Sequence, residues 1–282
     1  MLTEALVLAR ATYFIAAMLL FGANALRLMM RARLPHIAPL QLTALNGLAL
    51  AAAGLAACLW FVLAAAQMAD AVPTEAILAE ALHTLFGTGF MLRMAALVGT
   101  ALAFAMGGNL LALMLCGVLL AAPALTGHAA SSSPMHFTAI GMIIDGLHLL
   151  TAGFWLGGLA GLAILFARGT MKADLLLILG LFSETAMVAV LLLVMTGLIN
   201  AALVLLGGPG RASPLYLAVL GLKLLGVAAM LGLAATNRFR LMPTFGEEAQ
   251  ARLSRNVALE LGLGIVVAAL AALLGQLAPT LG

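Results

Sequence analysis

The chain alternates between long apolar runs and short polar connections, many of them marked by Gly or Pro. Eight runs are candidates for crossing the roughly 30 Å hydrocarbon core of a bilayer as helices. They cover residues 5–30, 39–67, 85–106, 109–126, 139–167, 175–206, 215–236 and 257–277. Because lipid offers the backbone no hydrogen-bond partners, each run is expected to be a closed helix. The pattern predicts an all-α, polytopic membrane bundle that forms one transmembrane domain over residues 1–282, with a tight hairpin at 107–109.

Composition supports a lipid environment. Hydrophobic residues make up 65% of the chain and charged residues 8%, whereas a soluble domain is about a quarter charged. The bilayer is therefore the main expected partner. The sequence contains no phosphate-binding loop, zinc-protease helix or nucleophile elbow. We expect a protein that is not an enzyme and has no nucleic-acid partner.

Charge placement predicts the orientation in the membrane. The connections after the first, fifth and seventh runs hold Arg27, Arg31, Arg33, Arg168, Lys172, Arg238, Arg240, Arg252 and Arg255. The connections on the other side hold only Arg211. Short loops rich in Lys and Arg stay on the cytoplasmic side. Both termini are therefore expected to lie outside the cytoplasm.

Residues that suit metal ions gather on the predicted outer side, around the fifth run. Asp145 and His148 are three residues apart, so on a helix they share one face, which Trp155 continues. The Asp either binds a cation directly or orients the His ring. Imidazole suits copper, zinc and nickel, and thioether favours Cu(I). The candidate metal ligands are His83, His128, Met135, His136, Asp145 and His148.

Small and polar residues inside the runs predict close helix contacts. Gly153, Gly157 and Gly161 recur every fourth residue, which lets another helix approach the fifth run closely. We expect this stripe to hold the fifth run at the centre of the bundle. Asn200 and Asn237 are expected to form hydrogen bonds across helices.

Five further charged residues lie inside the runs, namely Arg10, Arg93, Glu184, Lys223 and Glu260. Each costs on the order of 3 kcal/mol unless it finds a partner or water. Arg10 and Glu260 are close enough to helix ends for their charged groups to reach the interface. Glu184 and Lys223 either pair with each other or belong to a path for cations or protons.

Several short motifs follow one another along the chain. They are Thr126-Gly127-His128, Asp145-Gly-Leu-His148, Trp155-Leu-Gly157-Gly158-Leu, Phe182-Ser183, Thr196-Gly197-Leu-Ile-Asn200, Asn237-Arg238 and Glu260-Leu-Gly262. In their order and spacing they resemble the copper-resistance D (CopD) family of inner-membrane proteins. The resemblance extends from about residue 85 to the end of the chain, with weaker support from Phe21-Gly22.

The resemblance implies a multi-pass protein of the bacterial inner (plasma) membrane that handles copper. It also implies a separate periplasmic copper-binding partner of the CopC type, and movement of copper across the membrane with import favoured. Carried over by position, the functional candidates are His128, Asp145 and His148. His83, Met135 and His136 are further candidate ligands. They are included only because the predicted topology places them on the outer side of the membrane.

The leading hypothesis is a membrane protein that binds copper at the outward-facing His/Asp/Met site and transports it inward. One alternative is a b-type haem protein of membrane electron transfer, because His83, His128 and His148 lie on different helices or their ends. Another alternative is a docking partner for a periplasmic copper chaperone that transports nothing. A Soret band in the absorption spectrum would distinguish the haem protein from the other two.

Overall fold

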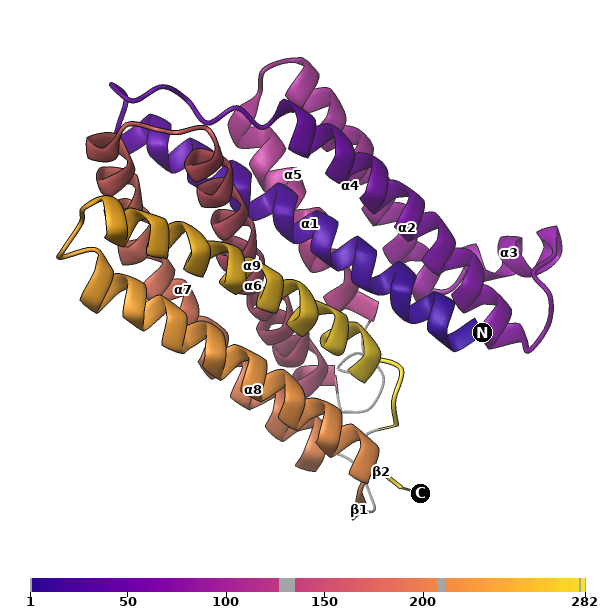
Figure 1. Ribbon diagram of the computed structural model, residues 1–282. Coiled ribbons are helices and arrows are strands. Elements are labelled where there is room, and N and C mark those ends of the chain that lie inside the picture. Colours follow the sequence, from indigo (N-terminus) through magenta and orange to yellow (C-terminus); the bar gives the residue numbers. More distant parts are fainter. Residues whose placement is uncertain (1, 127–134, 207–210, 279, 282) are drawn as a thin grey trace.

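The computed structural model of the chain describes residues 2–126, 135–206, 211–278 and 280–281, and it is a bundle of long, roughly aligned helices (Figure 1). The long helices are α1 (Leu2–Arg33), α2 (Thr43–Ala69), α4 (Leu85–Ala105), α6 (Met135–Ala167), α7 (Lys172–Leu206), α8 (Pro214–Thr236) and α9 (Glu247–Leu274). The short elements are α3 (Glu75–Leu82), α5 (Asn109–Ala121), the 3₁₀ helix η1 (Ala122–Thr126), the π-helical turn η3 (Asn237–Leu241), and the strands β1 (Arg211–Ala212) and β2 (Thr280–Leu281), which pair with each other. The prediction of a polytopic helical bundle is confirmed.

Seven of the described helices are long and apolar enough to cross a membrane. The fourth predicted run is shorter, with 13 residues in α5 and 5 in η1. At 1.5 Å per α-helical residue and 2.0 Å per 3₁₀ residue, the two together reach about 30 Å. The α-helix ends just before Pro123, which lacks the backbone N–H that a further helical turn requires. The tighter η1 therefore completes the length that a crossing needs.

The turns of the N-terminal half are set by residues with specific backbone preferences. Thr74 and Thr84 precede α3 and α4, and each hydroxyl accepts a hydrogen bond from the N–H three residues later. Gly107 has a positive φ of 74°, which glycine adopts without strain. It closes the predicted hairpin between α4 and α5. The helix α3 was not among the predicted runs, because it is only 8 residues long.

The helix α6 lies at the centre of the bundle, as the glycine stripe predicted. It packs against α1, α5, α7 and α9. At Gly22, Gly153 or Gly157, an added Cβ would collide with atoms of a facing helix. Because glycine presents no side chain, α1 and α6 approach each other directly.

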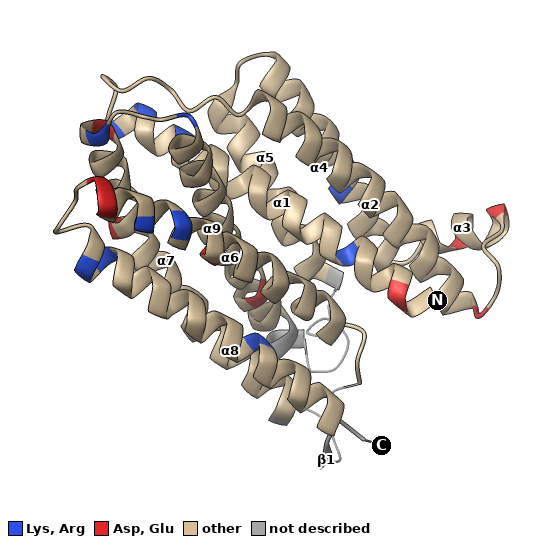
Figure 2. Cartoon of the chain, viewed as in Figure 1, with Lys and Arg blue, Asp and Glu red and all other residues tan. Residues whose placement is uncertain are grey.

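The two ends of the bundle differ in charge (Figure 2). Basic residues gather at the end where α1 and α8 finish and α9 begins, whereas both chain termini lie toward the other end. At the basic end, Lys172 pairs with Glu247 at 2.8 Å and Arg252 pairs with Glu248 at 2.7 Å. These exposed pairs add little to stability. The separation matches the orientation that the sequence predicts, with the basic end facing the cytoplasm.

Candidate metal site

Five polar side chains from three helices meet midway along the bundle. They are Asp145 and His148 on α6, Thr196 and Asn200 on α7, and Lys223 on α8, and we call them the outer polar cluster. The His148 Nδ1 lies 3.1 Å from the Thr196 Oγ1, and the Asn200 Nδ2 donates to the Asp145 Oδ1 at 3.3 Å. The Lys223 ammonium interacts electrostatically with both the Asp145 carboxylate and the His148 ring. The prediction that Asp145 and His148 share a helix face is confirmed, because both contact α7.

The spacing of residues on α6 and α7 brings these polar side chains opposite one another. The helices α6 and α7 run antiparallel, so the pair three apart on α6 faces the pair four apart on α7. Gly197 lies between Thr196 and Asn200 on the chain, and an added Cβ there would approach the His148 Cε1 to 3.2 Å. A glycine at this position therefore leaves room for the imidazole ring.

The Thr196 hydroxyl determines which nitrogen of His148 carries the proton. Its Oγ1 donates to the Leu192 carbonyl oxygen at 2.7 Å, so its single proton is already used. With its proton on Leu192, the hydroxyl accepts from His148, which places the proton on Nδ1; the Leu193 backbone also bonds to the ring. The Nε2 nitrogen consequently keeps its lone pair. This is the arrangement in which a histidine binds a metal through one nitrogen while a hydrogen bond fixes the other.

Lys223 has a different partner from the one the sequence predicted. Glu184 is exposed on α7, whereas Lys223 interacts with Asp145. Of the two alternatives given for Glu184 and Lys223, the ion pair is therefore wrong for the described structure. The sequence shows that both residues lie within apolar runs, but it does not show which helices face each other.

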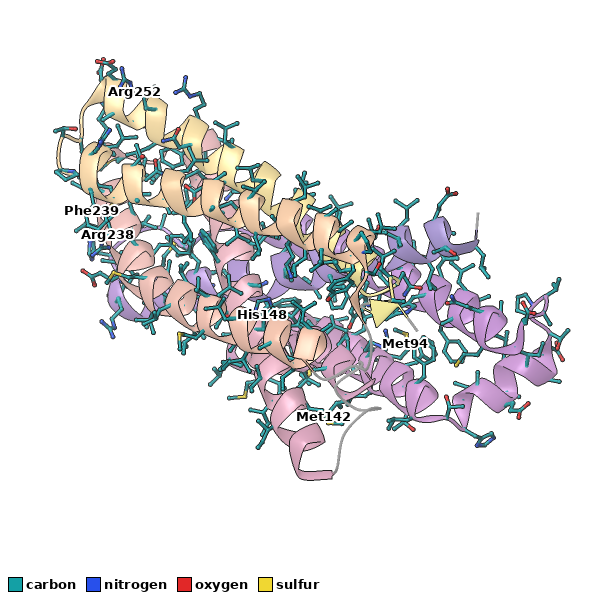
Figure 3. The ribbon with its side chains drawn as sticks, turned by 90° about the horizontal axis from the view of Figure 1, so that it is seen from below. Met94, Met142, His148, Arg238, Phe239 and Arg252 are labelled. Atoms are coloured by element: carbon teal, nitrogen blue, oxygen red, sulfur yellow. The ribbon has the colours of Figure 1, made fainter. Side chains whose placement is uncertain are left out.

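The outer polar cluster is partly open. Asp145, His148, Asn200 and Lys223 are partly exposed, and only Thr196 is buried. Figure 3 shows His148 about halfway along the bundle, well away from the basic end that Arg238 and Arg252 mark. The carboxylate and the imidazole ring are thus not fully enclosed by neighbouring helices.

The other predicted ligands have different positions. His128 lies outside the described residues, and Met135 and His136 begin α6 with side chains that the structure does not describe. His83 is exposed at the end of α3, which packs against α2 and α4 rather than against α6, α7 or α8. Within the described residues, no three His, Cys, Asp or Glu side chains are close enough to hold one metal ion. Of the six predicted ligands, the described side chains of Asp145 and His148 thus lie in one polar cluster, with Asn200 bonded to Asp145.

A second group of buried charges lies among α1, α2 and α4. We call Arg10, Tyr13, Trp60, Phe86 and Arg93 the arginine–aromatic cluster. The guanidinium carbon of Arg93 lies 4.4 Å from the ring centre of Trp60, 5.5 Å from that of Tyr13 and 5.6 Å from that of Phe86. The guanidinium of Arg10 lies 5.1 Å from Trp60 and donates to the Gly275 carbonyl oxygen. The aromatic faces stabilise both cations, and Arg10 also interacts electrostatically with the Asp145 carboxylate of the outer polar cluster.

The helical fold and the outer polar cluster together define a class, that of multi-spanning membrane proteins with charged and polar side chains clustered among their helices. Two family models match the chain: "Copper resistance protein D-like, N-terminal domain" over residues 1–136 and "Copper resistance protein D" over residues 176–274. The chain is also 35% identical to Copper resistance protein D of Pseudomonas syringae pv. tomato, over 92% of this chain and 90% of that protein. The chain therefore belongs to the copper resistance protein D family, as its motifs predicted.

A shorter similarity links the chain to Copper transport protein CutJ of Bacillus subtilis (strain 168). The two are 36% identical over 85 residues, which is 29% of this chain and 15% of that protein. No solved structure matches the chain significantly.

Proposed function

We propose that the protein transports copper across the bacterial inner membrane, in the inward direction, from a site at Asp145 and His148. The observation that carries the proposal is the hydrogen bond between His148 and Thr196, because it leaves the Nε2 lone pair of His148 free for a metal ion. The copper-related names of the two relatives support copper as the transported ion.

Lys223 acts as the counter-ion of the site when copper is absent. Its ammonium compensates the Asp145 carboxylate, which is costly to leave unpaired among transmembrane helices. When copper binds, the metal takes over this compensation and the ammonium is repelled from the site. Lys223 therefore competes with copper, which keeps binding reversible as a transporter requires.

Residues near the start of α6 bind copper in this proposal before it reaches Asp145 and His148. Two protein ligands are few for copper, and imidazole and thioether are among the groups that bind it. His128, Met135 and His136 supply such groups at or before the start of α6. Met135 and His136 lie at least nine residues before Asp145 on a continuous helix, about 14 Å along its axis, so they hold the ion at a separate, earlier position. His83 does not belong to this set, because α3 packs against α2 and α4 and not against α6, α7 or α8.

The direction of transport follows from the orientation. With the basic end in the cytoplasm, the outer polar cluster is reached from the periplasm. The membrane potential, negative inside, favours inward movement of a cation by about 2.3 kcal/mol per charge per 100 mV. A separate periplasmic copper-binding protein of the CopC type delivers the metal, and this delivery requires no ATP-binding motif in the chain.

Copper uptake into proteoliposomes tests the proposal. We expect uptake by the wild-type protein and its loss in His148→Ala, while His83→Ala, a histidine outside the cluster, remains active. Equal uptake by the wild type and His148→Ala would contradict the proposal. The absorption spectrum of the same preparation tests the haem alternative, because a Soret band would indicate electron transfer instead of transport.

A further inference from the structure

A second polar site lies in the half of the bundle nearer the basic end, and it contains Glu260. The Asn237 Nδ2 donates to the Glu260 Oε1 at 2.6 Å, and the Asn256 Nδ2 donates to the Asn237 Oδ1 at 2.7 Å. We call these three residues the inner polar cluster. All three are buried, and Glu260 is only 2% exposed. The expectation that the Glu260 carboxylate reaches the interface is therefore wrong, because the carboxyl is enclosed between helices.

A break in regular helical geometry places Asn237 in this cluster. Asn237 begins η3, in which the Met242 N–H bonds to the Asn237 carbonyl five residues earlier. Such π-helical turns are rare and are frequent at functional sites. In the same turn, the Arg238 Nη1 donates to the Ser183 Oγ of α7 at 2.6 Å. Two consecutive residues of η3 thus connect the inner polar cluster on α9 with α7.

No cation neutralises the Glu260 carboxyl within the described residues. The charged groups on α9 and on the elements packed against it are Glu4, Arg10, Arg27, Arg31, Arg33, Asp145, His148, Lys223, Arg238, Arg240, Glu247, Glu248, Arg252 and Arg255. Several have partners elsewhere: Arg27 bonds to Asn109, Arg238 to Ser183, and Lys223 acts on Asp145. In the described part of the chain, the polar group that acts on Glu260 is the Asn237 amide.

A carboxylate buried in a membrane protein without a cation is expensive, and proton uptake removes the charge. The Asn237 amide can donate to Oε1 whether the carboxyl is ionised or neutral. Asn256 fixes the orientation of that amide, because its own donor occupies the Asn237 Oδ1. The cluster therefore accommodates both protonation states of Glu260 without rearranging its hydrogen bonds.

We propose that Glu260 is a proton-binding site that couples proton movement to copper transport. The carboxylate takes up one proton, which forms one O–H bond and leaves a neutral acid, and it later releases that proton. No electrons are transferred in this step. The role in coupling rests on the proposed transport of copper, whereas proton binding itself does not. Oxygen and amide groups are hard donors, so this site suits a proton better than it suits Cu(I).

Infrared spectroscopy of the purified protein tests proton binding without copper. We expect a carboxylic acid C=O band that disappears reversibly as the pH is raised from about 4 to about 10. The band should be absent in Glu260→Gln and present in Glu184→Gln. Glu184 is the matched control, because it is exposed on α7 next to Ser183 and so lies at a similar depth. A band that survives in Glu260→Gln, or that does not titrate, would overturn the assignment.

A second variant tests the assignment independently if Glu260→Gln does not fold. Asn256→Leu has a similar volume and removes the group that orients the Asn237 amide, so the pH midpoint of the band should shift. An unchanged midpoint in folded Asn256→Leu would contradict the assignment of the band to Glu260 in the inner polar cluster.

Copper uptake at several pH values then tests coupling. We expect uptake by the wild type to depend on pH and uptake by Glu260→Gln not to. The same pH dependence in both would overturn coupling. A titrating band in a wild-type protein that takes up no copper would support the proton site and contradict transport.

Discussion

The outer polar cluster and the arginine–aromatic cluster both place charges inside the membrane. The two clusters differ in the groups that compensate these charges. Arg93 is 1% exposed and lies against three aromatic rings, and within the described residues no carboxylate acts on it. Asp145 and Lys223 compensate each other and remain partly exposed. Arg93 in the first arrangement is fully buried, whereas the charged groups of the second are partly exposed. A buried charge alone is thus no sign of a binding site; access and a free lone pair distinguish the two clusters.

The two clusters also differ in what they hold together. Rings from α1, α2 and α4 surround the Arg93 guanidinium, so that cluster joins the N-terminal helices. The outer polar cluster joins α6, α7 and α8 through single hydrogen bonds and one charge interaction. We therefore expect substitutions in the first to affect stability and substitutions in the second to affect copper binding.

The largest effect is expected from Trp60→Ala. Trp60 contacts both arginines and packs against Tyr13, Phe14 and Phe86. Its removal should lower the free energy of unfolding by about 3–5 kcal/mol, measured by denaturation in detergent. Leu48→Ala is the control, because Leu48 is 74% exposed on α2. Copper affinity of the folded Trp60→Ala protein should be unchanged, and a large loss of affinity would erase the distinction between the clusters.

The second-largest effect is expected on copper affinity when two histidines are replaced. We expect His128→Ala combined with His148→Ala to weaken copper binding by at least about tenfold, while the bundle stays folded. Titration of copper into the purified protein measures this change. His36→Ala is the control, since His36 is exposed between α1 and α2 at the basic end. Unchanged affinity in the folded double variant would place the copper site elsewhere.

Lys223→Met should change the copper affinity in the opposite direction. Because Lys223 competes with copper for Asp145, its removal is expected to tighten copper binding by about threefold to tenfold. Lys172→Met should leave the affinity as it is, because Lys172 pairs with Glu247 at the basic end. Weaker copper binding in Lys223→Met would show that the ammonium supports the site instead of competing with the metal.

The smallest effect is expected from Gly197→Ala. The new methyl group would approach the His148 ring and displace it by a few tenths of an ångström, which should weaken copper binding by about twofold to fivefold. Gly180→Ala on the same helix is the matched control, because an added Cβ there meets nothing within 4 Å. If both variants bind copper equally well, the position of the ring does not matter.

The sequence predicts the helices well, because each apolar run is long and lipid allows few other structures. It also predicts the shared face of Asp145 and His148, since three residues on a helix give a fixed angle. Partners on other helices were harder to predict. Asn200 and Asn237 were expected to bond across helices and do so. For Lys223, neither of the two alternatives named Asp145, the carboxylate that acts on it.

The misplaced residues share a physical cause. Periodicity gives the direction of a side chain on its own helix, but not how each helix is rotated and shifted against its neighbours. The enclosed position of Glu260 depends on the π-helical turn at Asn237, which no pattern in the sequence marks. The separation of His83 from the outer polar cluster depends on the packing of α3 against α4.

The X-ray absorption spectrum of bound copper is the most direct test of the outer polar cluster. It should be recorded on wild-type protein and on His148→Ala, each loaded with an equimolar amount of copper. We expect the wild-type spectrum to show histidine scattering and His148→Ala to lose part of that scattering or to bind no copper. Identical spectra and equal copper content in the two proteins would show that His148 is not a ligand, and would contradict transport from this cluster.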